Sequence, residues 1–99
     1  MRQIIFSKRA KNELIQLSEY LQLKFSIQVK NKFLDKFEKA IIIIQNNPEA
    51  FVKSDRNKFY KAVITKQTSI FYWFDFNKIN IVSVFDTRQN PNKINKKEQ

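Results

Sequence analysis

The sequence has 99 residues, enough for one modest hydrophobic core and too few for two domains. It contains no cysteine and no histidine, which excludes a disulfide framework, a cysteine metal site and the usual general base near neutral pH. Its formal net charge of +10 predicts an anionic partner, such as nucleic acid, a nucleoprotein, an acidic protein or a membrane surface.

We do not expect the N-terminal segment to act as an export signal. Its apolar run, Ile4–Phe6, is too short for the core of a signal peptide. No apolar stretch approaches the ~18 residues that a transmembrane helix needs. We therefore expect a cytoplasmic protein that does not enter a membrane. We also expect no metal ion or cofactor, so that any chemistry comes from Lys, Arg, Tyr, Asp or Glu.

The first predicted elements are a short strand and an amphipathic helix. The strand covers Arg2–Phe6, and Ser7 is placed to cap the helix by accepting a hydrogen bond from a free N–H of its first turn. Apolar side chains then recur at helical spacing, at Ala10, Leu14, Leu17 and Leu21, with Ile15 and Tyr20 widening the stripe. The pattern predicts a helix of about four turns.

A second helix is predicted from a cap at Ser26 to a stop at Asn46–Pro48. Its apolar stripe consists of Val29, Phe33, Leu34, Phe37, Ala40, Ile41 and Ile44. The run Ile41–Ile44 would also suit a strand, but the helical periodicity continues into it. Because the break between the two helices is short, we expect an antiparallel helical hairpin.

A polar loop, Pro48–Lys58, should lead into three strands. These segments are rich in β-branched and aromatic residues and cover Phe59–Thr65, Ser69–Phe76 and Lys78–Thr87. Short turns connect them, which predicts a meander. The chain has no glycine, so Asn77 is the best candidate for a positive φ in the last turn.

The predicted fold class is α+β, in the order β-α-α-β-β-β. A two-helix hairpin should pack on a small, mainly antiparallel sheet, because each layer needs the other to bury its apolar face. The first strand can join the sheet at its edge. We expect a single domain over residues 1–94 and a basic C-terminal tail over residues 95–99.

Three local motifs, in this order and at this chain length, resemble the RelE/ParE family of bacterial toxins from type II toxin–antitoxin systems. They are Phe6-Ser7 followed by Ala10 and Leu14; Asn47-Pro48 followed by Arg56 and Phe59–Val63; and the closing segment Val84–Pro91 with Arg88. The resemblance extends from Ile4 to about Ile94.

The resemblance implies one of two activities. RelE-like toxins cleave messenger RNA in the ribosomal A site, whereas ParE-like toxins inhibit DNA gyrase. Lys61 and Arg88 match basic positions of the nucleases, but Val63 and Ile70 stand near two further ones, and no Tyr or His follows Arg88. This favours a ParE-like toxin that binds gyrase. The alternative is a ribosome-dependent nuclease using Lys61, Arg56 and Arg88, and a third hypothesis is a basic nucleic-acid-binding module.

Two groups of residues are candidates for contacts with other molecules. Those for the target or nucleic acid are Lys53, Arg56, Lys58, Lys61 and Arg88, with Lys66 extending the cluster and Tyr60 offering a ring for stacking. Those for a cognate acidic antitoxin, in a hetero-oligomer, are Phe71, Tyr72, Trp73 and Phe74. The structural alternatives are a solvated Lys61, and an Arg88 that pairs with Asp86 or Asp75.

Overall fold

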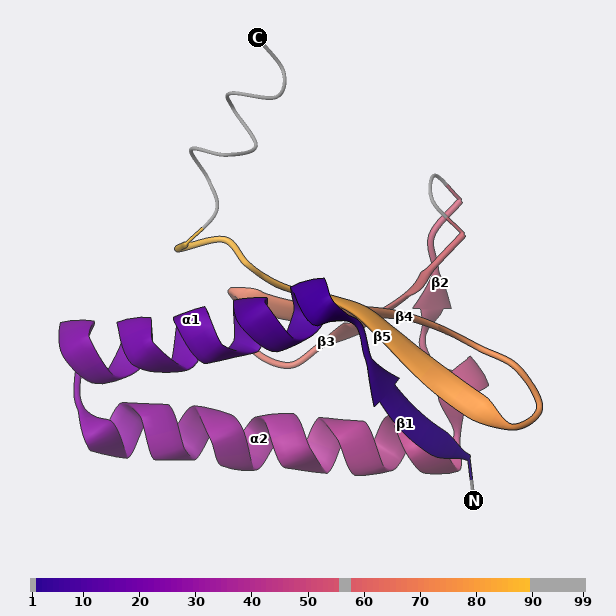
Figure 1. Cartoon of the computed structure of the whole chain (residues 1–99), viewed down its shortest axis with the longest axis horizontal. Helices are drawn as coiled ribbons and strands as arrows, with labels where there is room; N and C mark the ends of the chain where they lie inside the picture. Colours follow the sequence, from indigo (N-terminus) through magenta and orange to yellow (C-terminus); the bar gives the residue numbers. More distant parts are fainter. Residues whose placement is uncertain (1, 56–57, 90–99) are drawn as a thin grey trace, which may run out of the picture.

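The computed structural model describes residues 2–55 and 58–89, and its elements follow the predicted order with two additions, a short 3₁₀ turn and a two-residue strand (Figure 1). The elements are β1 (Gln3–Phe6), α1 (Lys8–Lys24), α2 (Ile27–Asn46), the 3₁₀ turn η1 (Pro48–Ala50), β2 (Val52–Lys53), β3 (Tyr60–Val63), β4 (Thr68–Phe74) and β5 (Lys78–Asp86). The predicted α+β class is therefore confirmed. The basic tail predicted over residues 95–99 lies outside the described residues.

Both predicted helix caps are present. The Ser7 hydroxyl accepts a hydrogen bond from the backbone N–H of Ala10 at 2.9 Å, and the Ser26 hydroxyl accepts one from Val29 at 3.1 Å. Each serine satisfies one of the N–H groups that the first turn leaves without a partner inside the helix. The two caps fix where the helices begin, and the hairpin between them is confirmed.

The hairpin buries most of its predicted stripes, but not all. The helical side chains in the core are Ala10, Leu17, Leu21, Phe33, Phe37 and Ile44. Ile15 is 56% exposed because it points away from this stripe, and the prediction that it joins the core is wrong. Val29 is 39% exposed because the connecting end of the hairpin extends beyond the strands (Figure 1).

The isoleucine run is helical, as predicted. Ile44 is completely buried and Ile41 packs against the core, while Ile42 and Ile43 are about half exposed. This alternation follows the helical period, since positions three apart share a face and the two between them do not. Continued periodicity therefore outweighed the strand propensity of four consecutive isoleucines.

The five strands form one sheet in the order β1-β5-β4-β3-β2. β1 pairs with β5 in parallel and the other neighbours are antiparallel, so the first strand does join the edge. β2 was not predicted. Val52 and Lys53 pair with Lys61 and Tyr60 inside a segment expected to be a polar loop, and two residues are too short to leave a periodic signal.

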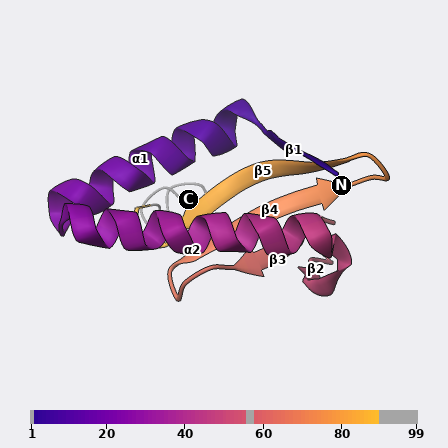
Figure 2. The same cartoon turned by 90° about the horizontal axis from the view of Figure 1, so that it is seen from below.

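The sheet has two unlike faces. The inner face packs on the helices with Tyr60, Ala62, Ile70, Tyr72, Ile79, Ile81 and Val84. The outer face, opposite the helices, carries Lys61, Val63, Phe71, Trp73, Asn80 and Phe85. In Figure 2, α2 lies in front of part of β4, β3 runs beside it, and α1 lies on the side of β5. No helix of the described residues is long and apolar enough to cross a membrane.

Side-chain hydrogen bonds replace glycine in the turns. Asp75 Oδ1 accepts hydrogen bonds from the backbone N–H groups of Asn77 and Lys78, both at 2.9 Å. This Asx turn closes the β4–β5 hairpin without a positive φ, so the expectation for Asn77 is wrong. Within residues 2–55 and 58–89, only Lys58 has a positive φ, of 66°.

Candidate functional site

The aromatic run in β4 divides between the two faces of the sheet. Phe71 and Trp73 lie on the outer face, and Trp73 is 40% exposed. Tyr72 and Phe74 face the core, because successive side chains of a strand point in opposite directions. Of the four residues predicted to bind an antitoxin, Phe71 and Trp73 therefore offer an open surface, whereas Tyr72 is 0% exposed.

Tyr72 is the centre of an aromatic cluster in the core. Its ring stacks on Tyr60 with 5.5 Å between centroids, and Phe51 meets it edge-on at 6.4 Å. Its hydroxyl donates a hydrogen bond to the Pro48 carbonyl oxygen, which ties η1 to the sheet. Burial raises the pKa of Tyr72 far above its usual range, so the phenol stays neutral. Tyr60 is consequently a packing residue and not a free stacking platform.

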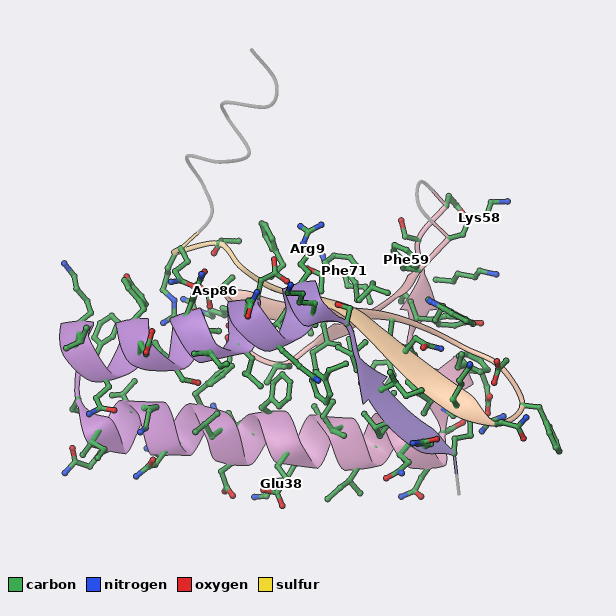
Figure 3. All side chains as sticks on the ribbon, viewed as in Figure 1. Arg9, Glu38, Lys58, Phe59, Phe71 and Asp86 are labelled. Atoms are coloured by element: carbon green, nitrogen blue, oxygen red, sulfur yellow. The ribbon has the colours of Figure 1, made fainter. Side chains whose placement is uncertain are left out.

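A hollow of about 360 Å³ opens on the outer face, lined by Arg9, Phe59, Phe71, Val82, Ser83 and Phe85. Figure 3 shows Arg9, Phe59 and Phe71 together on the side of the sheet away from α2. Three phenylalanine rings from three different parts of the chain make its wall apolar, and Arg9 places a charge at its rim. Phe59 and Phe85 belong to motifs that carry the family resemblance, but neither they nor Arg9 were predicted as contact residues, because they lie in separate segments of the sequence.

Glu13 holds the N-terminal part of α1 against β5, beside this hollow. Its Oε1 accepts hydrogen bonds from the Ser83 hydroxyl and the Val84 backbone N–H, both at 2.9 Å. Its Oε2 accepts one from Arg9 Nε at 3.2 Å. One carboxylate thus joins α1 to β5 and orients Arg9, whose side chain remains 66% exposed. Glu13 and Ser83 are 70 positions apart in the chain, so the sequence alone did not indicate this contact.

The predicted basic cluster does not form a single surface. Lys61 is exposed on the outer face, directly across from Phe71 in β4. Lys53 is paired with Tyr60, so it lies on the inner side, with its Nζ 5.8 Å from the Tyr60 ring centroid. Lys58 is exposed in the loop before β3, and Arg56 lies outside the described residues. Of the members of the cluster that the structure describes, Lys61 is the one paired across the strands with an outer-face aromatic residue, Phe71.

Arg88 forms a bidentate ion pair with Asp86, one of the two carboxylates considered as its partner. Arg88 Nε lies 3.1 Å from Asp86 Oδ1, and Nη2 lies 2.9 Å from Oδ2. Asp86 is 1% exposed and also accepts a hydrogen bond from the Thr68 hydroxyl. Burial acts to raise the pKa of Asp86, but the hydrogen bonds from Arg88 and Thr68 outweigh it and hold that pKa below its usual range.

Lys61 and Arg88 lie on opposite sides of the sheet. Thr68, the partner of Asp86 across the strands, faces inward, and the Arg88 guanidinium lies 6.0 Å from the centroid of the Phe25 ring at the end of the helical hairpin. Lys61 points outward beside Phe71. The structure thus does not bring together the two basic residues that the nuclease hypothesis requires.

Comparison with known proteins agrees with this fold. The model of the family described as ParE toxin of type II toxin–antitoxin system, parDE, matches residues 4–91. A search of curated protein sequences gave no match.

Three solved structures illustrate the similarity. A chain of the chromosomal ParDE system from P. aeruginosa aligns with a TM-score of 0.74 at 11% identity, covering 87% of this chain and 96% of the other. The YoeB dimer from Staphylococcus aureus aligns with a TM-score of 0.59 at 23% identity, covering 85% of this chain and 94% of the other. A chain of the E. coli DinJ–YafQ complex aligns with a TM-score of 0.56 at 10% identity, covering 90% of this chain and 97% of the other. At these identities the similarity establishes the fold.

Proposed function

Because this chain belongs to the ParE toxin family of type II toxin–antitoxin systems, we propose that it arrests growth by binding its target without cleaving it. DNA gyrase is the target that the ParE-like branch implies. The observation that carries this proposal is the separation of Lys61 from Arg88, which lie on opposite sides of the sheet.

Metal-independent RNA cleavage requires several groups around one phosphate. A base must activate the 2′-hydroxyl, an acid must protonate the leaving oxygen, and positive charge must stabilise the phosphate. Here Arg88 is already engaged by a buried carboxylate. Val63 and Ile70, near two further basic positions of the nucleases, are apolar, and Ile70 is completely buried. The described residues thus favour a binding protein over a nuclease.

We assign the outer face to the target, and with it Phe71 and Trp73, which the sequence analysis placed among the antitoxin contacts. It offers apolar anchors in the hollow formed by Phe59, Phe71 and Phe85, and cations at the margin in Arg9 and Lys61. Interfaces commonly combine a few aromatic anchors with a charged rim. An acidic surface of a protein target would match the charge, and the rings would supply most of the contact area.

A cognate antitoxin is the second partner that we propose. Two of the similar structures are complexes by their titles, the DinJ–YafQ toxin–antitoxin complex of E. coli and the YoeB–YefM complex of Staphylococcus aureus. In this chain several large apolar side chains of the helical hairpin are exposed, among them Leu23, Phe25, Ile27, Ile42 and Ile43. Apolar exposure on this scale is costly for a free monomer and favours a stable complex. An acidic antitoxin would also offset the +10 charge.

The deciding experiment is induction of the chain in a bacterial host without antitoxin. Messenger RNA integrity and plasmid supercoiling are followed in the same culture. The proposal expects intact messenger RNA, altered supercoiling and induction of the DNA damage response. Rapid cleavage of messenger RNA at codon boundaries would overturn it in favour of the RelE-like alternative.

A further inference from the structure

Three segments that are far apart in the sequence meet at the end of the molecule opposite the α1–α2 connection (Figure 1 and Figure 2). They are the N-terminal residue before β1, the last turn of α2 and the β4–β5 turn. The Gln45 side chain donates a hydrogen bond to the Arg2 carbonyl oxygen at 2.7 Å, and Arg2 Nε donates one to the Asp75 carbonyl oxygen at 2.9 Å. These two bonds join the three segments around a hollow of about 610 Å³.

This hollow, which we call the turn hollow, is polar apart from one ring. Its lining consists of Arg2, Gln45, Asn46, Phe76 and Asn77, and it includes no acidic side chain of the described residues. Its volume lies within the range of ligand sites in proteins, about 300–1,000 Å³. No residue that lines it also lines the outer hollow, so the two are separate surfaces.

Phe76 is 88% exposed although the backbone of its turn is fixed. Asp75 Oδ1 accepts hydrogen bonds from the N–H groups of Asn77 and Lys78, and the Asn77 carbonyl oxygen accepts one from the Gln3 N–H at 3.0 Å. The turn is therefore tied both to itself and to β1. An exposed ring on a fixed backbone loses little conformational entropy when a flat partner stacks on it.

Arg2 is held in place and keeps part of its hydrogen-bonding capacity. Its guanidinium lies 5.3 Å from the centroid of the Phe74 ring, and its Nε is used by the Asp75 carbonyl oxygen. Its two terminal nitrogens have no hydrogen-bond partner among residues 2–55 and 58–89. The carboxylate of Asp75 accepts its hydrogen bonds from the turn and does not line the hollow. A positioned guanidinium with free N–H groups is well suited to bind a phosphate.

The other polar groups of the turn hollow are amides. Asn46 and Asn77 are exposed, and within the described part of the chain neither side chain makes a hydrogen bond. Each amide presents a donor beside an acceptor, which matches the edge of a nucleobase. A ring for stacking, a guanidinium for phosphate and amides for a base edge are together the groups that bind an unpaired nucleotide. A peptide carboxylate would pair with Arg2 but leave the ring and the amides unused.

We propose that the turn hollow binds one unpaired nucleotide. The base stacks on Phe76, its edge meets the amides of Asn46 and Asn77, and the phosphate pairs with Arg2. A free nucleotide and a nucleotide of a single strand carry the same groups, whereas a duplex keeps its bases stacked and paired. This site goes beyond the proposed toxin function and does not depend on it.

The probe is adenosine monophosphate (AMP), added to the isotope-labelled full chain, with binding mapped from backbone amide NMR shifts. We expect shifts at residues 2–3, 45–46 and 75–78. Inorganic phosphate should shift only the residues next to Arg2, because it has no base to stack. A single-stranded hexanucleotide that binds at least about tenfold more tightly than AMP would identify the source as a nucleic acid strand. Equal binding would identify it as a free nucleotide, and the matching duplex should bind more weakly than the single strand.

Two matched pairs of variants test the contacts. Phe76→Ala should weaken AMP binding about tenfold, whereas Phe76→Tyr, which keeps the ring, should change it less than about twofold. Arg2→Gln should weaken it about fivefold. Lys24→Gln removes the same charge from the exposed last residue of α1, at the other end of the molecule, and should change it less than about twofold.

Three outcomes would overturn the assignment: equal losses within a pair, shifts centred on Phe71 and Phe85, or the same shifts from inorganic phosphate as from AMP. The measurement involves neither gyrase nor a host cell. Its failure would therefore leave the proposed target mechanism standing, and failure of the induction experiment would leave the turn hollow standing.

Discussion

The inner and outer faces of the sheet carry the same kinds of residue, but these residues are fixed in the interior on one face and accessible to a partner on the other. On the inner side, Arg88 is held by the buried carboxylate of Asp86, and Tyr72 is locked in a cluster of rings. On the outer side, Lys61 and Phe71 are open to a partner. The comparison teaches that an arginine or an aromatic ring in a toxin sequence says little about function until its face of the sheet is known.

The sharpest test of this comparison uses adjacent residues of β4. Tyr72→Ala should reduce the free energy of unfolding by about 3–5 kcal/mol, because it removes a fully buried ring. Phe71→Ala should reduce it by only about 1 kcal/mol, because that ring is partly exposed. Urea denaturation followed by fluorescence measures both values.

Growth inhibition should depend on Phe71 more than on the Tyr72 hydroxyl, the reverse of the order expected for stability. Phe71→Ala is expected to fold and to lose growth inhibition, since it removes an anchor of the outer hollow. Tyr72→Phe, which keeps the ring, should remain toxic. Full toxicity of Phe71→Ala at equal expression would remove the outer face from the proposed mechanism.

The next largest loss of stability is expected on breaking the Asp86–Arg88 ion pair on the inner side of the sheet. Asp86→Ala should cost about 2–4 kcal/mol of stability, because it leaves Arg88 and Thr68 without their shared partner. Asp35→Ala, which removes a carboxylate paired with Lys39 on the surface of α2, should cost less than about 0.5 kcal/mol. Similar costs at both sites would show that Asp86 does not organise the end of β5.

The pH dependence of stability should report the same ion pair. Because the pKa of Asp86 is lower in the folded chain than its ordinary value of 3.8, the pair stabilises the fold above that pH. Its contribution is lost as pH falls through the folded-state pKa. Thermal unfolding from pH 6 to pH 2 should show a steeper acid loss for the natural chain than for Asp86→Asn. Parallel curves would contradict the assigned shift.

The smallest effect on stability is expected at Lys61. Lys61→Ala should change the free energy of unfolding by less than about 0.5 kcal/mol, because the side chain is exposed on the outer face. Under the proposed mechanism it should weaken growth inhibition in part, as loss of a rim charge does. Complete loss of toxicity with antitoxin binding intact would point instead to a catalytic lysine.

Periodicity and capping carried most of the fold prediction. Ser7 and Ser26 begin the helices because a hydroxyl at the cap satisfies a free N–H group, a rule that needs no tertiary information. The alternation along β4 required some of its four aromatic residues to face outward. Which face of the sheet is exposed depended on where the helices packed. The helices therefore also decided that Phe71 and Trp73 are the two rings of β4 that face outward.

The candidate site was only partly readable from the sequence. Phe71, Trp73 and Lys61 were named as contact residues, and the structure places all three on the outer face. Phe59, Phe85 and Arg9 were missed because they come from separate segments. Tyr72 was included because a run of aromatic residues looks uniform until the sheet assigns alternate members to the core.

The sequence by itself determined the class of the fold, the ends of the helices, the strong positive charge and the family. These properties arise from local patterns and from sums over the chain. Only the tertiary structure decided that Asp86 forms an ion pair with Arg88, that Glu13 joins α1 to β5, and that α2 and β3 enclose a basic groove. Each of these depends on contacts between residues far apart in the chain or on the face toward which a strand residue points. Local periodicity constrains the spacing of side chains along an element, but the packing of one element on another decides which of those side chains meet.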